Sequence, residues 1–269
     1  MSEFSNERDG RGTLEWSDKS YNICLGCEHG CLYCFAKSMR CRYDAATRVP
    51  GGWDAQKLNP NRARFGAEVR PAGKDGTPGV VMFPTSHDIA PRFLPESLTT
   101  IKNLLLRNEV LIVSKPHMSV VRSLCRELKP QRDRILFRFT VGALDRALSA
   151  YWEPGAPPPS ERIQCLRFAH RCGFQTSVSI EPMLGDGEET LKLVTEVEPY
   201  VTDSIWVGKM QKIPRKNNAH VAGFKEAAGL IKAQQTDEKV MHLVNTLGKH
   251  PKIRWKDSIK AVVARCTAS

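Results

Sequence analysis

Four cysteines lie within eleven consecutive positions near the start of the sequence, at Cys24, Cys27, Cys31 and Cys34. Thiols at such close spacing bind a metal ion or an iron–sulfur cluster. Zinc sites usually take two cysteine pairs separated by roughly a dozen residues or more, so that each pair can turn before the two meet. Only residues 28–30 separate the two pairs here, which makes zinc the weaker alternative.

An iron–sulfur cluster needs only three of these ligands. Cys27, Cys31 and Cys34 form the pattern C-x3-C-x2-C, and three thiolates can hold three corners of a [4Fe–4S] cluster. This spacing is characteristic of the radical S-adenosylmethionine enzymes. Residues 22–36, NICLGCEHGCLYCFA, resemble the N-P-Y-x-G-C-x-H-x-C-x-Y-C-Y-A signature of their spore photoproduct lyase-like branch. Cys24 falls where that signature has tyrosine, so we do not expect it to be a cluster ligand.

Four later segments resemble the same branch in the same order, the last of them being closer to phage-encoded relatives. They are Thr85–Glu96, Leu111–Lys115, Glu153–Arg162 and Ser177–Gly185. The resemblance covers residues 20–210 and implies a partial barrel of parallel strands. It also implies that the open iron of the cluster binds S-adenosylmethionine. An external one-electron reductant, such as flavodoxin or ferredoxin, would then drive cleavage of this cofactor to a 5′-deoxyadenosyl radical that abstracts hydrogen from a substrate.

The resemblance also suggests which residues contact the cofactor. Tyr33 matches the aromatic residue that these enzymes place near the adenine. Thr85 and Ser86 would offer backbone groups to the amino group of the cofactor, and Lys115 would pair with its carboxylate. A lysine held at a strand end by any other carboxylate is the alternative for Lys115.

Two strand-like runs carry polar residues on one face. In the run LFRFT, Arg138 and Thr140 share a face, while the phenylalanines point the other way. Ser179 and Glu181 alternate similarly. Polar groups on the inner face of a core strand would be costly without partners, so they favour a barrel interior that contains a ligand.

Catalytic residues are harder to predict. Spore photoproduct repair uses a cysteine near the end of the second strand, and the segment GVVMFPTSHD has none. Cys24 and Cys41 are candidate radical relays, although buried cysteines are more often structural. His87 is a candidate proton donor or substrate contact, and a surface pair with Asp88 is the alternative.

The elements that position these residues alternate between short apolar strands and amphipathic helices, which predicts a parallel α/β fold. We expect a partial (β/α)6 barrel with outer helices over residues 20–210, a polar N-terminal segment over 1–19, and a basic helical C-terminal extension over 211–269 packed on the barrel. The expected strands are 20–25, 79–83, 110–113, 135–140, 176–180 and 204–207. The expected helices are 35–46, 98–107, 120–128, 159–171, 188–197 and 224–234, and the tail around 250–266 reads as a short strand or turn and a closing helix.

The chain of 269 residues carries a net charge of +11, and residues 201–269 hold 13 lysines and arginines against 5 acidic residues. A basic surface of this kind favours a polyanionic partner, so a nucleobase or nucleotide in DNA or RNA is the expected substrate of a lyase- or isomerase-type reaction. A small-molecule or peptide substrate, and a non-catalytic iron–sulfur module, are the alternatives. Nine cysteines without a disulfide pattern predict a cytoplasmic protein, and the sequence has no run of roughly 18 apolar residues, so we expect no membrane partner. We also expect a monomer.

Overall fold

The computed structural model describes Phe4 and residues 12–45, 52–64, 70–73, 76–211, 213, 218 and 220–268. Most of the predicted N-terminal segment 1–19 lies outside these residues. Among the helices of the described ranges, none is both long enough and apolar enough to cross a bilayer.

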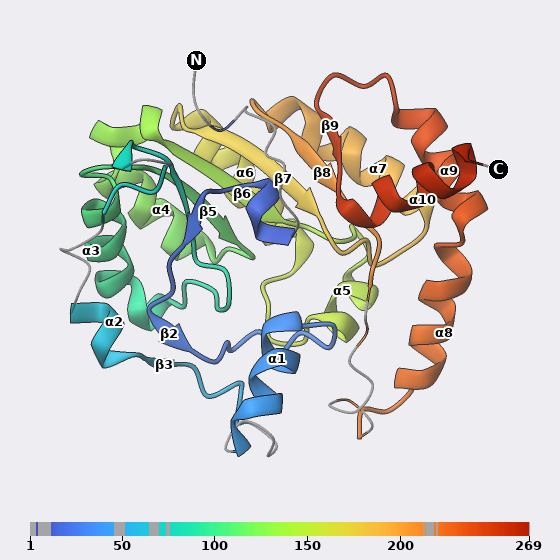
Figure 1. The fold of residues 1–269 in the computed structure, drawn as a ribbon, viewed down its shortest axis with the longest axis horizontal. Helices are drawn as coiled ribbons and strands as arrows, with labels where there is room; N and C mark the ends of the chain where they lie inside the picture. The colour runs from blue at the N-terminus through green and yellow to red at the C-terminus, as the bar shows by residue number, and fades with distance from the viewer. Residues whose placement is uncertain are drawn as a thin grey trace.

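Seven parallel strands of the described chain form one curled sheet, in the order β1-β4-β5-β6-β7-β8-β9 (Figure 1). They are β1 (Lys19–Ser20), β4 (Val80–Phe83), β5 (Glu109–Ser114), β6 (Ile135–Thr140), β7 (Gln175–Ile180), β8 (Ile205–Val207) and β9 (Ile253–Trp255). The predicted partial α/β barrel is confirmed. The sheet has one strand more than predicted, because the predicted tail strand β9 pairs with β8.

The first predicted strand, 20–25, is divided between two sheets. Its start belongs to β1, but β2 (Cys24–Leu25) pairs antiparallel with β3 (Lys57–Leu58) in a separate two-stranded sheet. The chain leaves the barrel sheet between β1 and β2, because a side chain takes the place of a neighbouring strand as hydrogen-bond partner. The backbone N–H of Ile23 donates to His87 Nε2 at 3.1 Å. The prediction of one continuous strand was therefore wrong.

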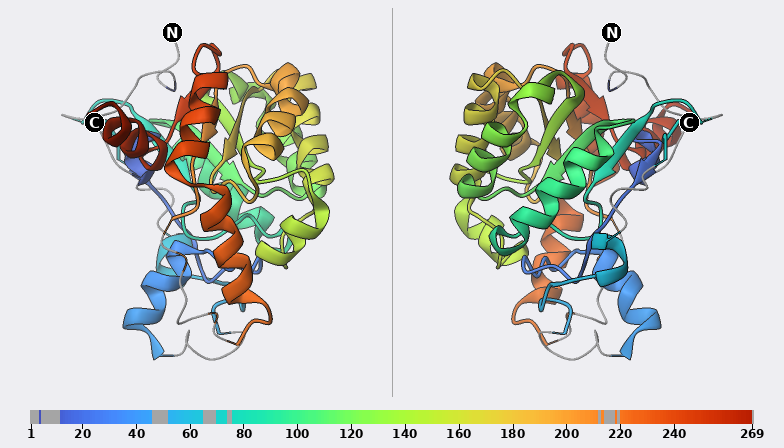
Figure 2. Two further views of the ribbon diagram at one scale, coloured as in Figure 1. Left: turned by 90° about the vertical axis from the view of Figure 1, so that its right-hand side faces the viewer. Right: turned by 90° about the vertical axis from the view of Figure 1, so that its left-hand side faces the viewer.

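The helices of the barrel lie on the outer face of the sheet (Figures 1 and 2). They are α3 (Leu94–Leu104), α4 (Met118–Glu127), α6 (Pro159–Arg171) and α7 (Gly187–Val197), with the short α5 (Arg146–Trp152) following β6. The C-terminal part adds α8 (Phe224–Gln234), α9 (Asp237–Leu247) and α10 (Asp257–Thr267), while α1 (Phe35–Tyr43) and α2 (Pro60–Arg64) lie near the cysteine loop. Three of these helices, α2, α5 and α9, were not predicted.

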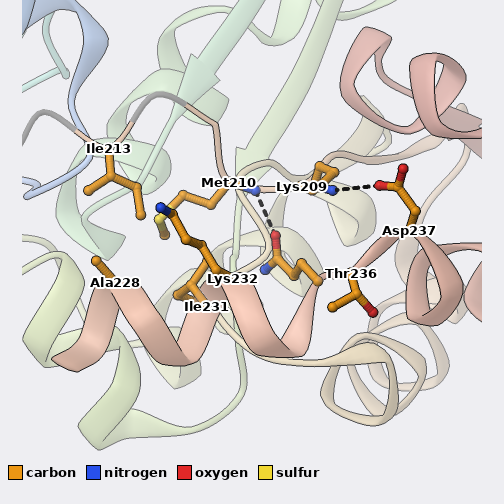
Figure 3. Close-up of a pocket in the computed structure, with 9 residues that line it drawn as sticks. Lys209, Met210, Ile213, Ala228, Ile231, Lys232, Thr236 and Asp237 are labelled. Carbon is orange, nitrogen blue, oxygen red and sulfur yellow. Dashed lines mark hydrogen bonds and ion pairs between the residues drawn. The ribbon is translucent and has the colours of Figure 1, made fainter. Parts of the chain in front are cut away.

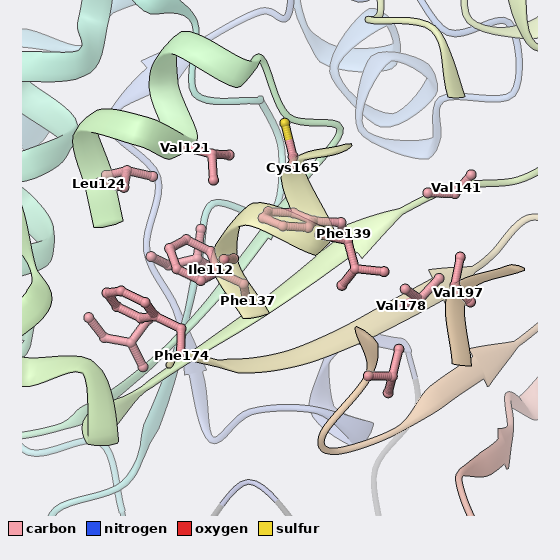
Figure 4. Close-up of a cluster of buried hydrophobic side chains, with 14 of the residues drawn as sticks. Ile112, Val121, Leu124, Phe137, Phe139, Val141, Cys165, Phe174, Val178 and Val197 are labelled. Carbon is pink, nitrogen blue, oxygen red and sulfur yellow. The ribbon is translucent and has the colours of Figure 1, made fainter. Parts of the chain in front are cut away.

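The main core lies between the sheet and the outer helices. Phe137 and Phe139 project from β6 into it, and the ring of Phe137 lies 5.1 Å from that of Phe174 (Figure 4). The opposite face of β6 carries Arg138 and Thr140, so the alternation expected from the run LFRFT is confirmed.

Aromatic rings and a cation fill the barrel interior at the level of Arg138. Trp16 and Trp206 meet edge to face at 5.7 Å, and the Arg138 guanidinium lies 4.8 Å and 5.3 Å from their ring centres. Arg138 also donates to Ser177 Oγ at 2.9 Å. Because this level is filled, open space is left toward the carboxyl ends of the strands, where barrels of this type hold their ligands.

Candidate functional site

Backbone hydrogen bonds hold the cysteine loop on two sides. Cys27 N donates to Trp53 O at 3.0 Å on one side, and Leu32 N donates to Trp152 O at 2.9 Å on the other. Gly26 has a φ of +79°, and a Cβ at this position would collide with the Trp53 carbonyl. The loop therefore needs glycine here both for its backbone conformation and for its close approach to residue 53.

The four cysteines of the loop face two different spaces. Cys27, Cys31 and Cys34 line one cavity of about 1100 Å³, whereas Cys24 is part of the β2–β3 sheet and lines a separate hollow. Cys34 is also the N-cap of α1, where its Sγ accepts a hydrogen bond from Lys37 N at 3.3 Å. Burial raises the pKa of Cys31 to about 12 and raises that of Cys34 above its usual value.

The donor set fits a cluster better than a single ion. The sulfur ligands of a [4Fe–4S] cluster surround a cube rather than a point, so they lie further apart than the ligands of one zinc. Three thiols on one cavity wall, with the fourth facing elsewhere, match the cluster requirement.

Asp88 connects the cysteine loop to the sheet, a role that the sequence did not reveal. Its carboxylate accepts hydrogen bonds from Ile89 N at 2.8 Å, from Lys115 N at 2.7 Å and from the Ser114 hydroxyl. His29 Nδ1, in the middle of the loop, lies 3.4 Å from the same carboxylate. Burial lowers the pKa of His29 to about 4, so this ring is neutral at pH 7.

Glu153 is the centre of a second buried network behind the loop. The Arg162 guanidinium lies 2.6 Å from its carboxylate, and both side chains are fully buried. The Tyr33 hydroxyl also donates to Glu153, and Lys115 Nζ lies 3.7 Å away. Lys115 and Arg162 lower the pKa of Glu153 and outweigh the opposing effect of burial, which keeps this carboxylate ionised.

Several predicted cofactor contacts meet in the large cavity. Its lining includes Tyr33, Thr85, Ser86, Lys115, Thr140, Ser179 and Glu181, together with His87. Ser179 Oγ is buried and has no hydrogen-bond partner among the described residues, so it can receive a ligand. Thr85 N and Ser86 N both donate to Asn22 Oδ1, at 2.8 Å and 2.9 Å, which fixes the turn after β4 against the segment that precedes the loop.

Other predicted residues lie apart from the cavity or have structural partners. Arg138 belongs to the filled level of the barrel described above, and Cys41 is buried on α1; neither lines the cavity. The ring of His87 is buried rather than on the surface, and both of its nitrogens have backbone partners, Ile23 N at 3.1 Å and Asp88 O at 3.0 Å. The alternative of a surface pair between His87 and the Asp88 carboxylate is therefore wrong, whereas its role as a proton donor or substrate contact stays a prediction.

Another part of the cavity lining, which we call its C-terminal wall, comes from residues that are distant in the sequence from the cysteines. It includes Trp16 and, from the C-terminal part, Lys256 and Lys260. Lys256 is buried and its Nζ lies 2.8 Å from Glu15 Oε1, 3.7 Å from Glu181 Oε2 and 4.2 Å from the centre of the Trp16 ring. In the sequence, only the run IRWKDS at residues 253–258 signals this part of the lining. We interpreted the positive charge of the C-terminal tail as a property of the protein surface.

A smaller hollow of about 500 Å³ lies between α8 and the segment after β8 (Figure 3). Gln235 Oε1 accepts from Met210 N at 2.9 Å, and Lys209 Nζ lies 3.6 Å from Asp237. Gln235 also donates to the carbonyls of Met183 and Gly185. These contacts attach the C-terminal helices to the rim of the barrel, and the hollow contains none of the predicted site residues.

Comparison with known proteins agrees with this architecture. No family model matches the chain. An uncharacterized protein of Acidianus two-tailed virus is 24% identical over 166 residues, which are 60% of this chain and 54% of the viral protein. The chain thus spans about half the length of that relative.

The solved structures are more informative about the fold. Spore photoproduct lyase, complexed with dinucleoside spore photoproduct, has a TM-score of 0.57 at 13% identity over 93% of this chain and 78% of the lyase. Streptococcus suis SuiB, bound to the precursor peptide SuiA, has a TM-score of 0.57 at 13% identity over 92% of this chain and 50% of SuiB. The chain therefore has the fold of two radical S-adenosylmethionine enzymes, as its cysteine loop predicted.

Proposed function

We propose that this chain is a radical S-adenosylmethionine enzyme in which Cys27, Cys31 and Cys34 hold a [4Fe–4S] cluster. The observation that carries the proposal is the division of the four loop cysteines between two spaces: three line the large cavity and Cys24 does not. A closed zinc site would use all four thiols together. When bound, the cluster and S-adenosylmethionine would supply the radical chemistry, by which hydrogen would be abstracted from the substrate after one-electron reduction.

The residues of the chain bind and orient the cofactor in this proposal. Lys115 Nζ lines the cavity and lies 3.7 Å from Glu153, beyond hydrogen-bond distance, so it can also meet the carboxylate of the cofactor. Thr140 and Ser179 present hydroxyls from neighbouring strands β6 and β7, where a ribose could lie. The ring of Tyr33 is fixed by its hydrogen bond to Glu153, which would hold it beside the adenine.

We further propose a nucleobase or nucleotide, in DNA or RNA, as the substrate of a lyase- or isomerase-type reaction. The cavity of about 1100 Å³ exceeds the roughly 300–1,000 Å³ of usual ligand pockets, so it has room for a second molecule beside the cofactor. The net charge of +11 favours a polyanion. A peptide is the second candidate, because SuiB, which shares the fold, binds a precursor peptide.

Anaerobic reconstitution with iron and sulfide tests the cluster. The wild-type chain and Cys24→Ala should bind four irons per chain to the same extent, whereas Cys31→Ala should lose most of its iron. With dithionite as reductant, the wild type and Cys24→Ala should release 5′-deoxyadenosine from S-adenosylmethionine. Equal iron binding by Cys24→Ala and Cys31→Ala would contradict the proposed ligand set.

The substrate class is tested with the same reconstituted protein. Thymine-bearing oligonucleotides, modified nucleotides and peptides are compared for their stimulation of S-adenosylmethionine cleavage. Binding of oligonucleotides should weaken steeply with increasing salt, because each neutralised phosphate releases counterions. Stimulation by peptides or free metabolites alone would reject the nucleic-acid substrate and leave the cluster assignment intact.

A further inference from the structure

A carboxyl group of the large cavity is not used by the proposed cofactor contacts. Glu181 follows β7 and lines this cavity. It lies near Lys256 and Glu15, whose side chains are only 3% and 2% accessible, whereas the side chain of Glu181 is 32% accessible. A ligand in the cavity can therefore reach Glu181 much more readily than it can reach the other two side chains.

Lys256 leaves the Glu181 carboxyl group without a hydrogen bond. The Lys256 Nζ donates to Gly12 O at 2.8 Å and lies 2.8 Å from Glu15 Oε1. Its distance to Glu181 Oε2 is 3.7 Å, which is beyond hydrogen-bond distance. The charge of Lys256 is thus balanced mainly by Glu15, and the oxygens of Glu181 remain available to a ligand.

The surroundings of Glu181 favour its neutral form. Burial raises the pKa of this carboxyl group, and the carboxylates of Glu15 and Asp257 raise it further, whereas Lys256 acts in the opposite direction. An ionised carboxylate can only accept hydrogen bonds, but a neutral carboxyl group donates one and accepts others. Glu181 can therefore offer a donor and an acceptor side by side.

Flat apolar surface lies close to this carboxyl group. Pro182 follows Glu181 and lines the cavity, and the Trp16 ring of the C-terminal wall has its centre 4.2 Å from Lys256 Nζ. Proteins that hold a single nucleobase in a pocket combine apolar contact with hydrogen bonds to the edge of the base. The surroundings of Glu181 contain both kinds of group.

We propose that Glu181 binds the hydrogen-bonding edge of a nucleobase in the cavity. Its hydroxyl donates to an oxygen or nitrogen of the base, and its carbonyl oxygen accepts from the neighbouring N–H. This proposal rests on the proposed function and deepens it, because it names the residue that recognises the substrate and the group that is recognised. Each of the common bases has a donor next to an acceptor on this edge, so the contact requires a base without selecting one.

The charge of the C-terminal wall favours a nucleotide over a basic peptide. Lys256 is paired with Glu15, and Lys209, which also lines the cavity, lies 3.6 Å from Asp237. Lys260 lines the same cavity and has no ion pair within the described ranges, so it is available to a phosphate. A cationic side chain of a peptide would be repelled by it. Peptide binding therefore serves as an outcome of the test.

The test uses two variants of Glu181 and one control in the reconstituted protein with S-adenosylmethionine. Glu181→Ala removes the carboxyl group, Glu181→Gln keeps a donor next to an acceptor, and Glu188→Ala changes an exposed glutamate of α7 as the matched control. The probes are a thymidine trinucleotide, an abasic trinucleotide with the same phosphates and a lysine-containing tripeptide. Calorimetry measures their binding.

The variants should separate the contact with the base from the contact with the phosphates. At a pH of about 6, Glu181→Ala should bind the thymidine probe at least about fivefold more weakly than the wild type. Glu181→Gln and the control should stay near the wild-type affinity, because the amide of glutamine also donates and accepts. The abasic probe should bind all four proteins equally.

The pH dependence gives a readout that a purely structural role would not change. Glu181 loses its donor on ionisation, so the wild type should bind the thymidine probe more weakly as the pH rises through the raised pKa of Glu181, between about 5 and about 8. Binding by Glu181→Gln should stay constant relative to the wild type, since an amide does not titrate. The other titrating groups of the cavity are common to both proteins.

Three results would overturn the assignment of Glu181. The first is equal affinity of the wild type and Glu181→Ala for the thymidine probe. The second is a loss in Glu181→Ala that is the same for the abasic probe, or that affects the tripeptide instead. The third is a weaker affinity for S-adenosylmethionine with unchanged affinity for the probe, which would make Glu181 a cofactor contact. If Glu181→Ala does not fold, the pH profiles of the wild type and Glu181→Gln decide.

The proposed function and the role of Glu181 fail in different ways. If peptides bind and neither trinucleotide does, the nucleic-acid substrate is wrong and the role of Glu181 is wrong with it. If the thymidine probe binds and stimulates S-adenosylmethionine cleavage equally in the wild type and Glu181→Ala, only the role of Glu181 is wrong. If the chain binds no iron, the cluster assignment is wrong, and the same titrations without the cluster still decide the role of Glu181.

Discussion

His29 Nδ1 lies 3.4 Å from Asp88 Oδ2, so the loop that carries the three cavity-lining cysteines is connected to the carboxyl ends of β4 and β5. Asp88 also accepts hydrogen bonds from the buried N–H groups of Ile89 and Lys115. Asp88→Ala leaves these donors unsatisfied, so we expect the free energy of unfolding to fall by about 2–5 kcal/mol. Urea unfolding at constant pH measures this difference.

The isosteric variant Asp88→Asn separates the two roles of this side chain. Its amide oxygen can still accept from Ile89 N and the Ser114 hydroxyl, but its NH2 group then faces Lys115 N, so only part of the stability should return, and the contact with His29 loses its charged partner. Relative to the wild type, we expect Asp88→Asn to have a larger effect on the KM for S-adenosylmethionine than on the free energy of unfolding. If Asp88→Ala unfolds at the wild-type urea concentration, Asp88 does not connect the loop to the sheet.

Glu153→Gln removes the only carboxylate that faces two buried cations, Arg162 and Lys115, within the part of the chain that the structure describes. Breaking a buried ion pair from one side leaves an uncompensated charge, so the free energy of unfolding should fall by about 3–5 kcal/mol. Thermal and urea unfolding check this value. The exposed Glu238→Gln is the control and should stay within about 0.5 kcal/mol of the wild type.

Ser179→Ala should affect ligand binding and leave stability nearly unchanged. The buried Ser179 hydroxyl has no partner in the described ranges, so its removal breaks no hydrogen bond of the folded chain. If it binds the cofactor, losing one hydrogen bond of about 1 kcal/mol raises the KM for S-adenosylmethionine about fivefold. Ser177→Ala is the contrasting variant, since Ser177 Oγ accepts from Arg138 and donates to Ser204 O. A lowered stability with unchanged KM in Ser179→Ala would reject the proposed contact.

Gly26→Ala should disrupt the cysteine loop. Both Gly26 and Gly76 have a positive φ, +79° and +76°, so alanine strains the backbone at either position. Only at Gly26 would the new Cβ also collide with a carbonyl, that of Trp53, whereas no described atom lies within 4 Å of a Cβ at Gly76. We therefore expect Gly26→Ala to lose bound iron after reconstitution and Gly76→Ala to retain it. Equal iron content in the two variants would show that the contact with Trp53 is unimportant.

The regular parts of the fold could be predicted from local sequence patterns. Helices α6 and α8 begin and end at the predicted residues, because amphipathic runs and Pro159 mark their limits. The division of the first strand could not be predicted, because the hydrogen bond from Ile23 N to His87 depends on residues 64 positions apart. The same reason explains why the burial of His87 could not be predicted, since its nitrogens bind the backbone atoms of Ile23 and Asp88.

The site was predictable in the part that depends on spacing. The pattern of Cys27, Cys31 and Cys34 is local, and the structure places all three on one cavity wall. Asp88 gave no signal, since its importance comes from contacts with Ser114 and Lys115, 26 and 27 residues later. Lys256 was likewise counted only as one of many charges in a basic tail, although it is buried against Glu15.

The contact between Lys256 and Glu15 has a consequence for the order in which the protein can be assembled. Gly12 N donates to Asp257 Oδ2 across 245 residues of sequence, so one wall of the cavity requires both regions at once. Lys256 follows the cysteine loop by more than two hundred residues of sequence. Pairings over such long separations form slowly. The lining of the cavity is therefore complete only after β9 has joined the sheet.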